Sequence, residues 1–211
     1  MLRNVMAACL AAMAGVALAA TPTLAESLLA KLAKTPPVST PFVQVSYRGM
    51  LSRPLVVSGT LKWLGGDRMQ RDIAKPFNET AKIGDGELSV QRGHGEVHRM
   101  LLTRAPQVGA MLAGFRALLG GDVSALEQGF TLSAQGGDAH WVVMLAPRTS
   151  ELKQQIKSIV IDGRNAEPRC LTVRDANGDS SITLVGAMAK AGLRSVAPLE
   201  SALAVRCRNA R

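Results

Sequence analysis

One apolar segment constrains the fold of this chain more than any other feature. Residues 105–119 form the longest apolar run outside the extreme N-terminus, and their large side chains recur at helical spacing. Pro106 suits the first turn of a helix, and Gly120 ends it. Because the sequence on both sides alternates as β-strands do, this helix is either a core helix packed on a sheet or a lid over an apolar groove. Its apolar face consists of Val108, Met111, Leu112, Phe115, Leu118 and Leu119.

Short alternating segments separated by turn residues predict an antiparallel meander of roughly ten strands. The Asn177-Gly178 step is the strongest turn signal. A meander of this length curls towards a barrel. We therefore expect a mainly β fold with a helical lid (α+β), in which helices cover the concave apolar face of an incomplete, curled antiparallel β-barrel. Strands are expected at 42–48, 55–64, 68–73, 77–83, 87–91, 97–103, 130–134, 139–145, 157–162, 169–174 and 180–185, and short helices at 27–34, 123–128 and 151–155.

The N-terminus has the pattern of a secretory signal peptide. The positive charge of Arg3 precedes an apolar stretch, residues 5–18, that is too short to span a bilayer, and a small-x-small cleavage pattern ends at Ala19. We expect residues 1–19 to be removed and residues 20–211 to form one domain, since this length suits a single core. No later run approaches membrane-spanning length, so we predict an exported protein with no transmembrane segment. We also expect it to act as a monomer in the periplasm.

The chain is basic, with a formal net charge of +9. A basic exported protein is biased towards anionic surfaces such as phospholipid headgroups. Export also separates the protein from nucleic acid, which we exclude as a partner. Because the charged residues are scattered rather than clustered, solubility is the simplest explanation of their number.

Two of the three cysteines, Cys170 and Cys207, lie beyond the predicted signal peptide. In an oxidising compartment we expect them to form a disulfide that ties the tail to the sheet. The chain-entropy model values such a bond at about 4 kcal/mol. The alternative is two separate buried thiols.

The motifs of common enzymes are absent from the sequence. It contains no Gly-x-Ser-x-Gly elbow, no phosphate-binding loop and no Gly-x-Gly-x-x-Gly. His94 and His98 stand in strand-like sequence with no third ligand nearby, which argues against a metal site. With both cysteines assigned to a disulfide, no Cys/His nucleophile pair remains. We therefore expect no enzyme activity, no cofactor and no metal.

A series of short segments in a fixed order resembles a known family. The sequence has, in order, a signal peptide, a short leucine helix, Phe42-x-Gln44, Ser58-Gly59-Thr60-Leu61, the basic strand Arg68 to Arg71, Lys75-Pro76, Phe115 to Asp122, Trp141 to Pro147, Ile159 to Gly163 and Gly178-Asp179. Together they resemble the periplasmic outer-membrane lipoprotein carriers, the LolA-like family, and most closely its divergent LolA-related branch. The family fold is an incomplete, curled sheet whose concave face is closed by helices.

The resemblance implies a lipid-binding domain that shelters acyl chains of lipoproteins or related lipids for transfer to the outer membrane. Its partners would be an inner-membrane donor protein and an outer-membrane acceptor protein. Two alternatives remain open. One is a carrier for aryl-polyene-type lipids, and the other is a non-enzymatic lipid or lipoprotein sensor in envelope-stress signalling.

The resemblance also suggests which residues would meet the lipid. We expect the lid face described above and one face of a long strand to line the groove. The strand residues are Leu55, Val57, Leu61 and Trp63. In the classical carriers an arginine shortly after the Gly-x-Leu strand holds the lid shut. The aligned position here is Gly65, so Arg68, three residues on, is the candidate latch.

Overall fold

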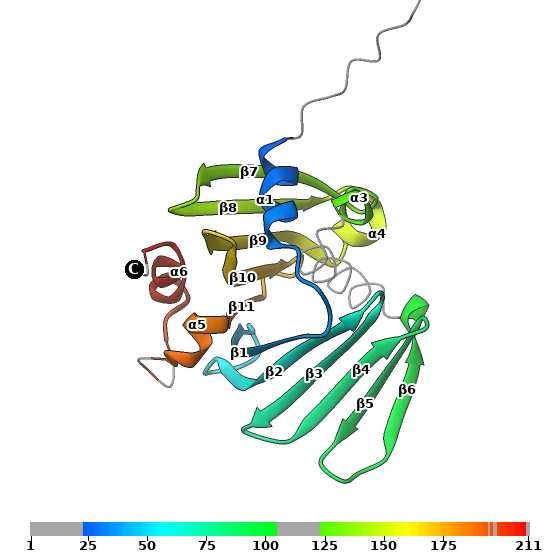
Figure 1. Cartoon of the computed structure of the whole chain (residues 1–211). Helices are drawn as coiled ribbons and strands as arrows, with labels where there is room; N and C mark the ends of the chain where they lie inside the picture. Colours follow the sequence, from blue (N-terminus) through cyan, green and yellow to red (C-terminus); the bar gives the residue numbers. More distant parts are fainter. Residues whose placement is uncertain (1–22, 105–122, 194, 196–197, 210–211) are drawn as a thin grey trace, which may run out of the picture.

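The computed structural model describes residues 23–104, 123–193, 195 and 198–209 (Figure 1). The predicted signal peptide lies outside these residues, and so does the predicted lid face, Val108 to Leu119.

Eleven strands of the described residues form one antiparallel sheet in the order β6-β5-β4-β3-β2-β1-β11-β10-β9-β8-β7. The strands are β1 (Val38–Tyr47), β2 (Leu55–Gly65), β3 (Arg68–Lys75), β4 (Glu79–Gly84), β5 (Glu87–Arg92), β6 (Val97–Leu101), β7 (Phe130–Gly137), β8 (His140–Pro147), β9 (Ile156–Arg164), β10 (Glu167–Asp175) and β11 (Ser180–Val185). The first and last strands pair in the middle, and β6 and β7 are the edges of a sheet that does not close. The predicted mainly β fold with an open antiparallel sheet is confirmed.

Short helices accompany the sheet: α1 (Leu24–Leu32), the 3₁₀ turn η1 (Leu102–Arg104), α3 (Val123–Glu127), α4 (Ser150–Lys153), α5 (Gly186–Lys190) and α6 (Glu200–Asn209). Helix α1 begins three residues before the predicted start at Ser27 because Thr23 caps it. The Thr23 hydroxyl accepts a hydrogen bond from the Glu26 backbone N–H at 3.2 Å, and the Glu26 carboxylate accepts one from the Thr23 N–H. These two bonds make a capping box, which satisfies N–H groups that the first turn leaves unpaired.

The strand register divides the sheet into two faces. Side chains alternate along a strand, and directly paired residues of antiparallel strands point to the same side. Leu61 shares a side with Thr40 of β1, and the same side continues through the centre of the sheet to Leu171 on β10 and Val143 on β8. We call this side the inner face and the opposite side the outer face.

Helix α1 covers one end of the inner face. Its leucines at positions 28, 29 and 32 are almost fully buried and pack with Leu126 of α3 and with the inner-face residues of β7, β8 and β9. Figure 1 shows α1 lying across β7 and β8. The amphipathic leucine spacing thus seats the helix on the apolar side of the sheet.

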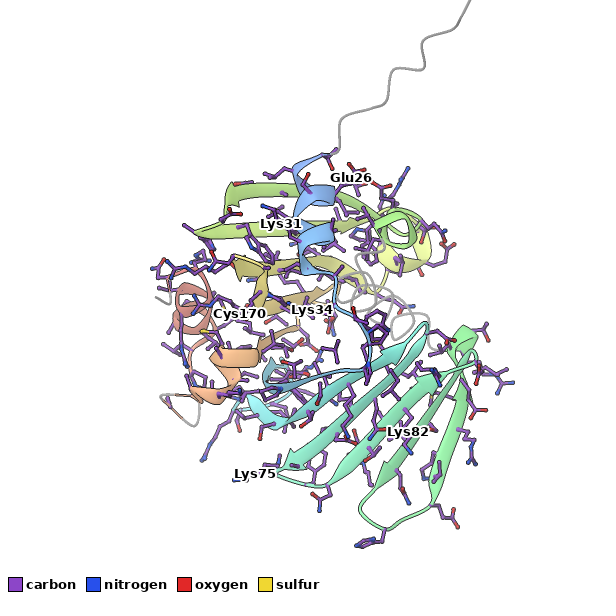
Figure 2. The ribbon with its side chains drawn as sticks, in the orientation of Figure 1. Glu26, Lys31, Lys34, Lys75, Lys82 and Cys170 are labelled. Carbon is purple, nitrogen blue, oxygen red and sulfur yellow. A yellow bond between two sulfur atoms is a disulfide. The ribbon has the colours of Figure 1, made fainter. Side chains whose placement is uncertain are left out.

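Helices α5 and α6 cover the middle of the outer face. Met188 of α5 and Leu203 of α6 pack against Ile182 and Leu184 of β11. The sulfur atoms of Cys170 and Cys207 lie 2.09 Å apart as a disulfide, with Cα atoms separated by 5.8 Å; Cys170 is labelled beside α6 in Figure 2. The disulfide attaches α6 to β10. It therefore ties the tail to the sheet, as predicted.

The sequence after Gly186 shows no recognisable pattern, yet this tail is partly helical. It contains α5 and α6. Helix α6 buries only Leu203 and Cys207, so its sequence shows too few apolar positions for a helical period to be recognised.

Candidate binding groove

Two adjoining cavities lie along the central strands, the first on the inner face and the second beyond the end of β11, where residues of β1, β10 and α5 line it. The first has a volume of about 550 Å³ and the second about 370 Å³, and Leu61 and Leu171 line both. Arg71 of β3 and Ile159 of β9 line the first cavity although four strands separate β3 from β9 in the sheet order. The sheet therefore curls around the first cavity, and we treat the two cavities that share Leu61 and Leu171 as one groove.

The groove runs along the central strands. Asp175, the last residue of β10, lines the first cavity, and Glu167, the first residue of this nine-residue strand, lines the second. At about 3.3 Å per residue this strand is about 26 Å long. Pockets of several hundred Å³ with mainly apolar walls are the usual sites for small ligands.

The two ends of the groove differ in polarity. Beside its apolar residues, the first cavity is lined by Gln44, Arg48, Arg71, Gln155, Asn177 and Thr183. The second cavity is lined mainly by small or apolar groups, among them Val38, Pro41, Ile161, Val185 and Ala187. Its charged residues Lys34, Glu167 and Lys190 are exposed to solvent. Figure 2 labels Lys34 at the point where the chain leaves α1. A molecule along the groove would have one polar and one apolar environment.

The four strand residues predicted to face a ligand share the inner face. Val57, Leu61 and Trp63 are buried, whereas Leu55 at the start of β2 is 42% exposed. Of these, Leu61 lines both cavities, while Val57 packs with Phe42 beside them. The indole Nε1 of Trp63 donates to the Gly66 carbonyl at 3.0 Å, which fixes the ring against the β2–β3 turn. The role of these residues in binding stays a prediction.

The candidate latch, Arg68, is the first residue of β3. Because the next residue, Met69, lies on the inner face, the Arg68 side chain belongs to the outer face. Its side chain is exposed and donates to the Leu64 carbonyl at 3.3 Å. The segment that it was predicted to hold lies outside the described residues, so its role stays a prediction.

Arg71 is the basic residue that β3 places on the inner face, between Met69 and Ile73, which are both buried. Its guanidinium carbon lies 4.9 Å from the centre of the Phe42 ring, and Nη2 donates to Gln44 Oε1 at 3.1 Å. Burial lowers the pKa of Arg71, although the charge of Glu79 opposes this. Sequence reasoning missed this position, but the alternation Met69-x-Arg71-x-Ile73 indicates an arginine on the apolar side of a strand.

Arg48, at the polar end of the first cavity, is charge-paired. Its guanidinium donates to Asp175 and, at 3.3 Å, to Asp179. Burial lowers the pKa of Arg48, but the two carboxylates outweigh this and raise it overall. Asp179 also accepts the Gly49 backbone N–H at 2.9 Å, so this cluster ties the β1–β2 connection to the β10–β11 turn.

A larger hollow of about 980 Å³ lies elsewhere, between α5, α6 and Arg169. It is separated from the inner face by the sheet, and its walls include exposed residues such as Leu199 and Val205. Over the described ranges, no group of three or more His, Cys, Asp or Glu side chains is placed to hold a metal ion. The groove thus offers space beside both polar and apolar side chains.

Comparison with known proteins identifies a family. A family model described as "Outer membrane lipoprotein carrier protein LolA-like" matches residues 17–210. No curated protein matches the sequence.

Three solved structures are similar to this chain. A LolA superfamily protein from Nitrosomonas europaea is 11% identical, covers 77% of this chain and 91% of its own, and has a TM-score of 0.42. A DUF1329 family protein from Desulfovibrio piger is 10% identical, with coverages of 77% and 90% and a TM-score of 0.40. The MucA/MucB complex of Pseudomonas aeruginosa contains a chain that is 14% identical, with coverages of 84% and 59% and a TM-score of 0.38.

Proposed function

Because this chain belongs to the LolA-like family of outer-membrane lipoprotein carrier proteins, we propose that it shelters lipid acyl chains in the periplasm. Its cargo would be lipoproteins or related lipids on their way to the outer membrane. The family match confirms the resemblance that the sequence motifs predicted. The observation that carries the proposal is the groove along the central strands, whose two cavities adjoin at Leu61 and Leu171.

The energetics of the groove suit a carrier. A buried methylene contributes about 0.8 kcal/mol, so a chain of about fifteen methylenes gains roughly 12 kcal/mol gross. The loss of freedom on association offsets about 4–15 kcal/mol of this gain. The resulting affinity allows both capture and release. The predicted lid face, Val108 to Leu119, would cover the same apolar surface when cargo is absent.

Export and partners belong to the same proposal. None of the helices in the described parts of the chain is long and apolar enough to cross a membrane. A disulfide between Cys170 and Cys207 suits an oxidising compartment such as the periplasm. We propose that residues 20–211 act as one lipid-binding domain that receives cargo from an inner-membrane donor and delivers it to an outer-membrane acceptor.

Native mass spectrometry of protein purified from the periplasm, followed by lipid extraction, tests the proposal. A co-purifying acyl species that leaves on organic extraction supports the carrier function and identifies the cargo class. A protein that carries no lipid and takes up none when lipid is added contradicts it.

Two tryptophan substitutions locate the bound lipid. Ser181 lines the first cavity, so Ser181→Trp should fill part of that space and reduce lipid occupancy. Ser58 lies on the outer face of β2, where Ser58→Trp introduces the same ring away from the groove. Both variants should keep the cooperative thermal unfolding of the parent protein. Equal occupancy in the two variants would place the lipid elsewhere.

Leu112→Glu, which places a charge on the predicted lid face, tests the lid in the same assay.

A further inference from the structure

The groove contains a positive charge that the protein does not balance. The Arg71 side chain is half-buried on the inner face and lines the first cavity together with Phe42 and Leu61. Its contacts are the Phe42 ring, at 4.9 Å from the guanidinium carbon, and the Gln44 side-chain oxygen at 3.1 Å. Both are neutral groups. A guanidinium has five N–H donors, so most of its hydrogen-bonding capacity remains for another partner.

The nearby carboxylates are committed to other cations. Glu79 acts on Arg71 only through its charge, and its Oε2 lies 2.7 Å from Nε of Arg92. Asp175 pairs with Arg48. Among the described residues, no ion pair includes Arg71. Taking a cation out of water is unfavourable unless an anion or several hydrogen bonds replace the lost hydration.

The rest of the groove is arranged for a molecule with one polar end. Arg71, Gln44 and Thr183 line the first cavity, whereas Val38, Ile161 and Val185 line the second. Lys34 and Lys190, at the rim of the second cavity, are exposed and keep their hydration. Arg71 is therefore the cation at which a buried anion gains most.

We propose that the groove selects an anionic lipid, with the charged head group bound to the Arg71 guanidinium and the acyl chain directed towards Val185. This inference rests on the proposed carrier function and adds the chemical class of the cargo. Carboxylates and phosphates both match the planar fork of a guanidinium and form charge-assisted hydrogen bonds with it. The Phe42 ring and the Gln44 amide hold the guanidinium in place before the lipid arrives.

A fluorescent fatty acid and its methyl ester test the inference, since they share a chain and differ in charge. Fluorescence titration at neutral pH should show that the wild-type protein binds the acid at least about tenfold more tightly than the ester. Arg71→Met should remove this preference while changing affinity for the ester by less than about twofold. Arg71→Lys, which keeps the charge without the fork, should retain part of the preference.

Arg99→Met is the matched control. Arg99 pairs with Ser89 in the β5–β6 register, on the outer face, and its side chain is 64% exposed. This variant removes the same charge and should keep the full preference for the acid. Acetate, an anion without a chain, should not compete with the fatty acid.

Each contrary result has a distinct meaning. Equal wild-type affinity for acid and ester overturns the head-group inference and leaves the carrier function intact. Equal loss of both ligands in Arg71→Met also overturns it, because Arg71 would then serve the structure of the groove. Failure of the wild-type protein to bind either ligand contradicts the carrier function itself.

Discussion

Affinity for lipids should rise steeply with chain length and then stop rising. A series of saturated fatty acids that differ by two carbons varies only the apolar area placed in the groove. Each buried methylene contributes about 0.8 kcal/mol, which is about fourfold in Kd, so each two-carbon step should tighten binding by about fifteenfold. The gain should end when the chain fills the groove, which follows β10 for about 26 Å from Asp175 to Glu167.

Competition against a bound fluorescent fatty acid gives the Kd of each member of the series. Binding that reaches a plateau supports a groove of finite length. A Kd that does not change with chain length would refute the reasoning, because the acyl chain would then remain in water. Ser181→Trp, which shortens the groove at its polar end, should move the plateau to shorter chains.

Two further predictions concern the stability of the fold that forms the groove. A Cβ at Gly163 would lie 1.9 Å from the fully buried Trp141 ring, whose Nε1 donates to the Asn165 carbonyl. Gly163→Ala should therefore lower the free energy of unfolding by about 2–4 kcal/mol in urea denaturation, whereas Gly137→Ala, which meets no atom within 4 Å, should cost much less. The hydrogen bond from the Gly49 N–H is the main reason why the pKa of Asp179 is lowered. The stabilisation by this carboxylate is therefore present at neutral pH and is lost as the pH falls below about 4. Asp179→Asn should thus be less stable than the parent protein at neutral pH, and this deficit should shrink as the pH falls through the lowered pKa of Asp179. A deficit that does not change with pH would contradict this assignment.

Local signals were sufficient to predict most of the sheet. Turn residues such as Asn177 and Gly178 separate alternating segments, and the β10–β11 hairpin turns at that step. Some strands are longer than predicted. β1 begins at Val38 rather than at Phe42, because pairing with β2 continues where the alternation of apolar side chains has already ended. Helix α1 was predicted with a late start, since the Thr23 capping box precedes the apolar residues that identify the helix.

The site was less accessible to sequence reasoning than the fold. Val57, Leu61 and Trp63 were grouped correctly on one face because a strand has a period of two residues. Arg71 was passed over in favour of Arg68, since alignment by distance along the chain does not reveal on which face of β3 a side chain lies. The alternation Met69-x-Arg71-x-Ile73 indicates the side of the strand, and the register between β2 and β3 shows that this side is the inner face.

The sequence by itself determined the strand-rich fold, the family and the four strand residues of the inner face, because these depend on local periodicity and on the order of short motifs. Only the tertiary structure decided that β1 pairs with β11, that β3 and β9 curl around one cavity, and that Arg71 lies there without a carboxylate partner. These features depend on residues far apart in the chain, such as Phe42 and Arg71, which are in contact, and Leu61 and Leu171, which line the same cavity. No local pattern encodes such contacts, since they form only when the whole sheet assembles.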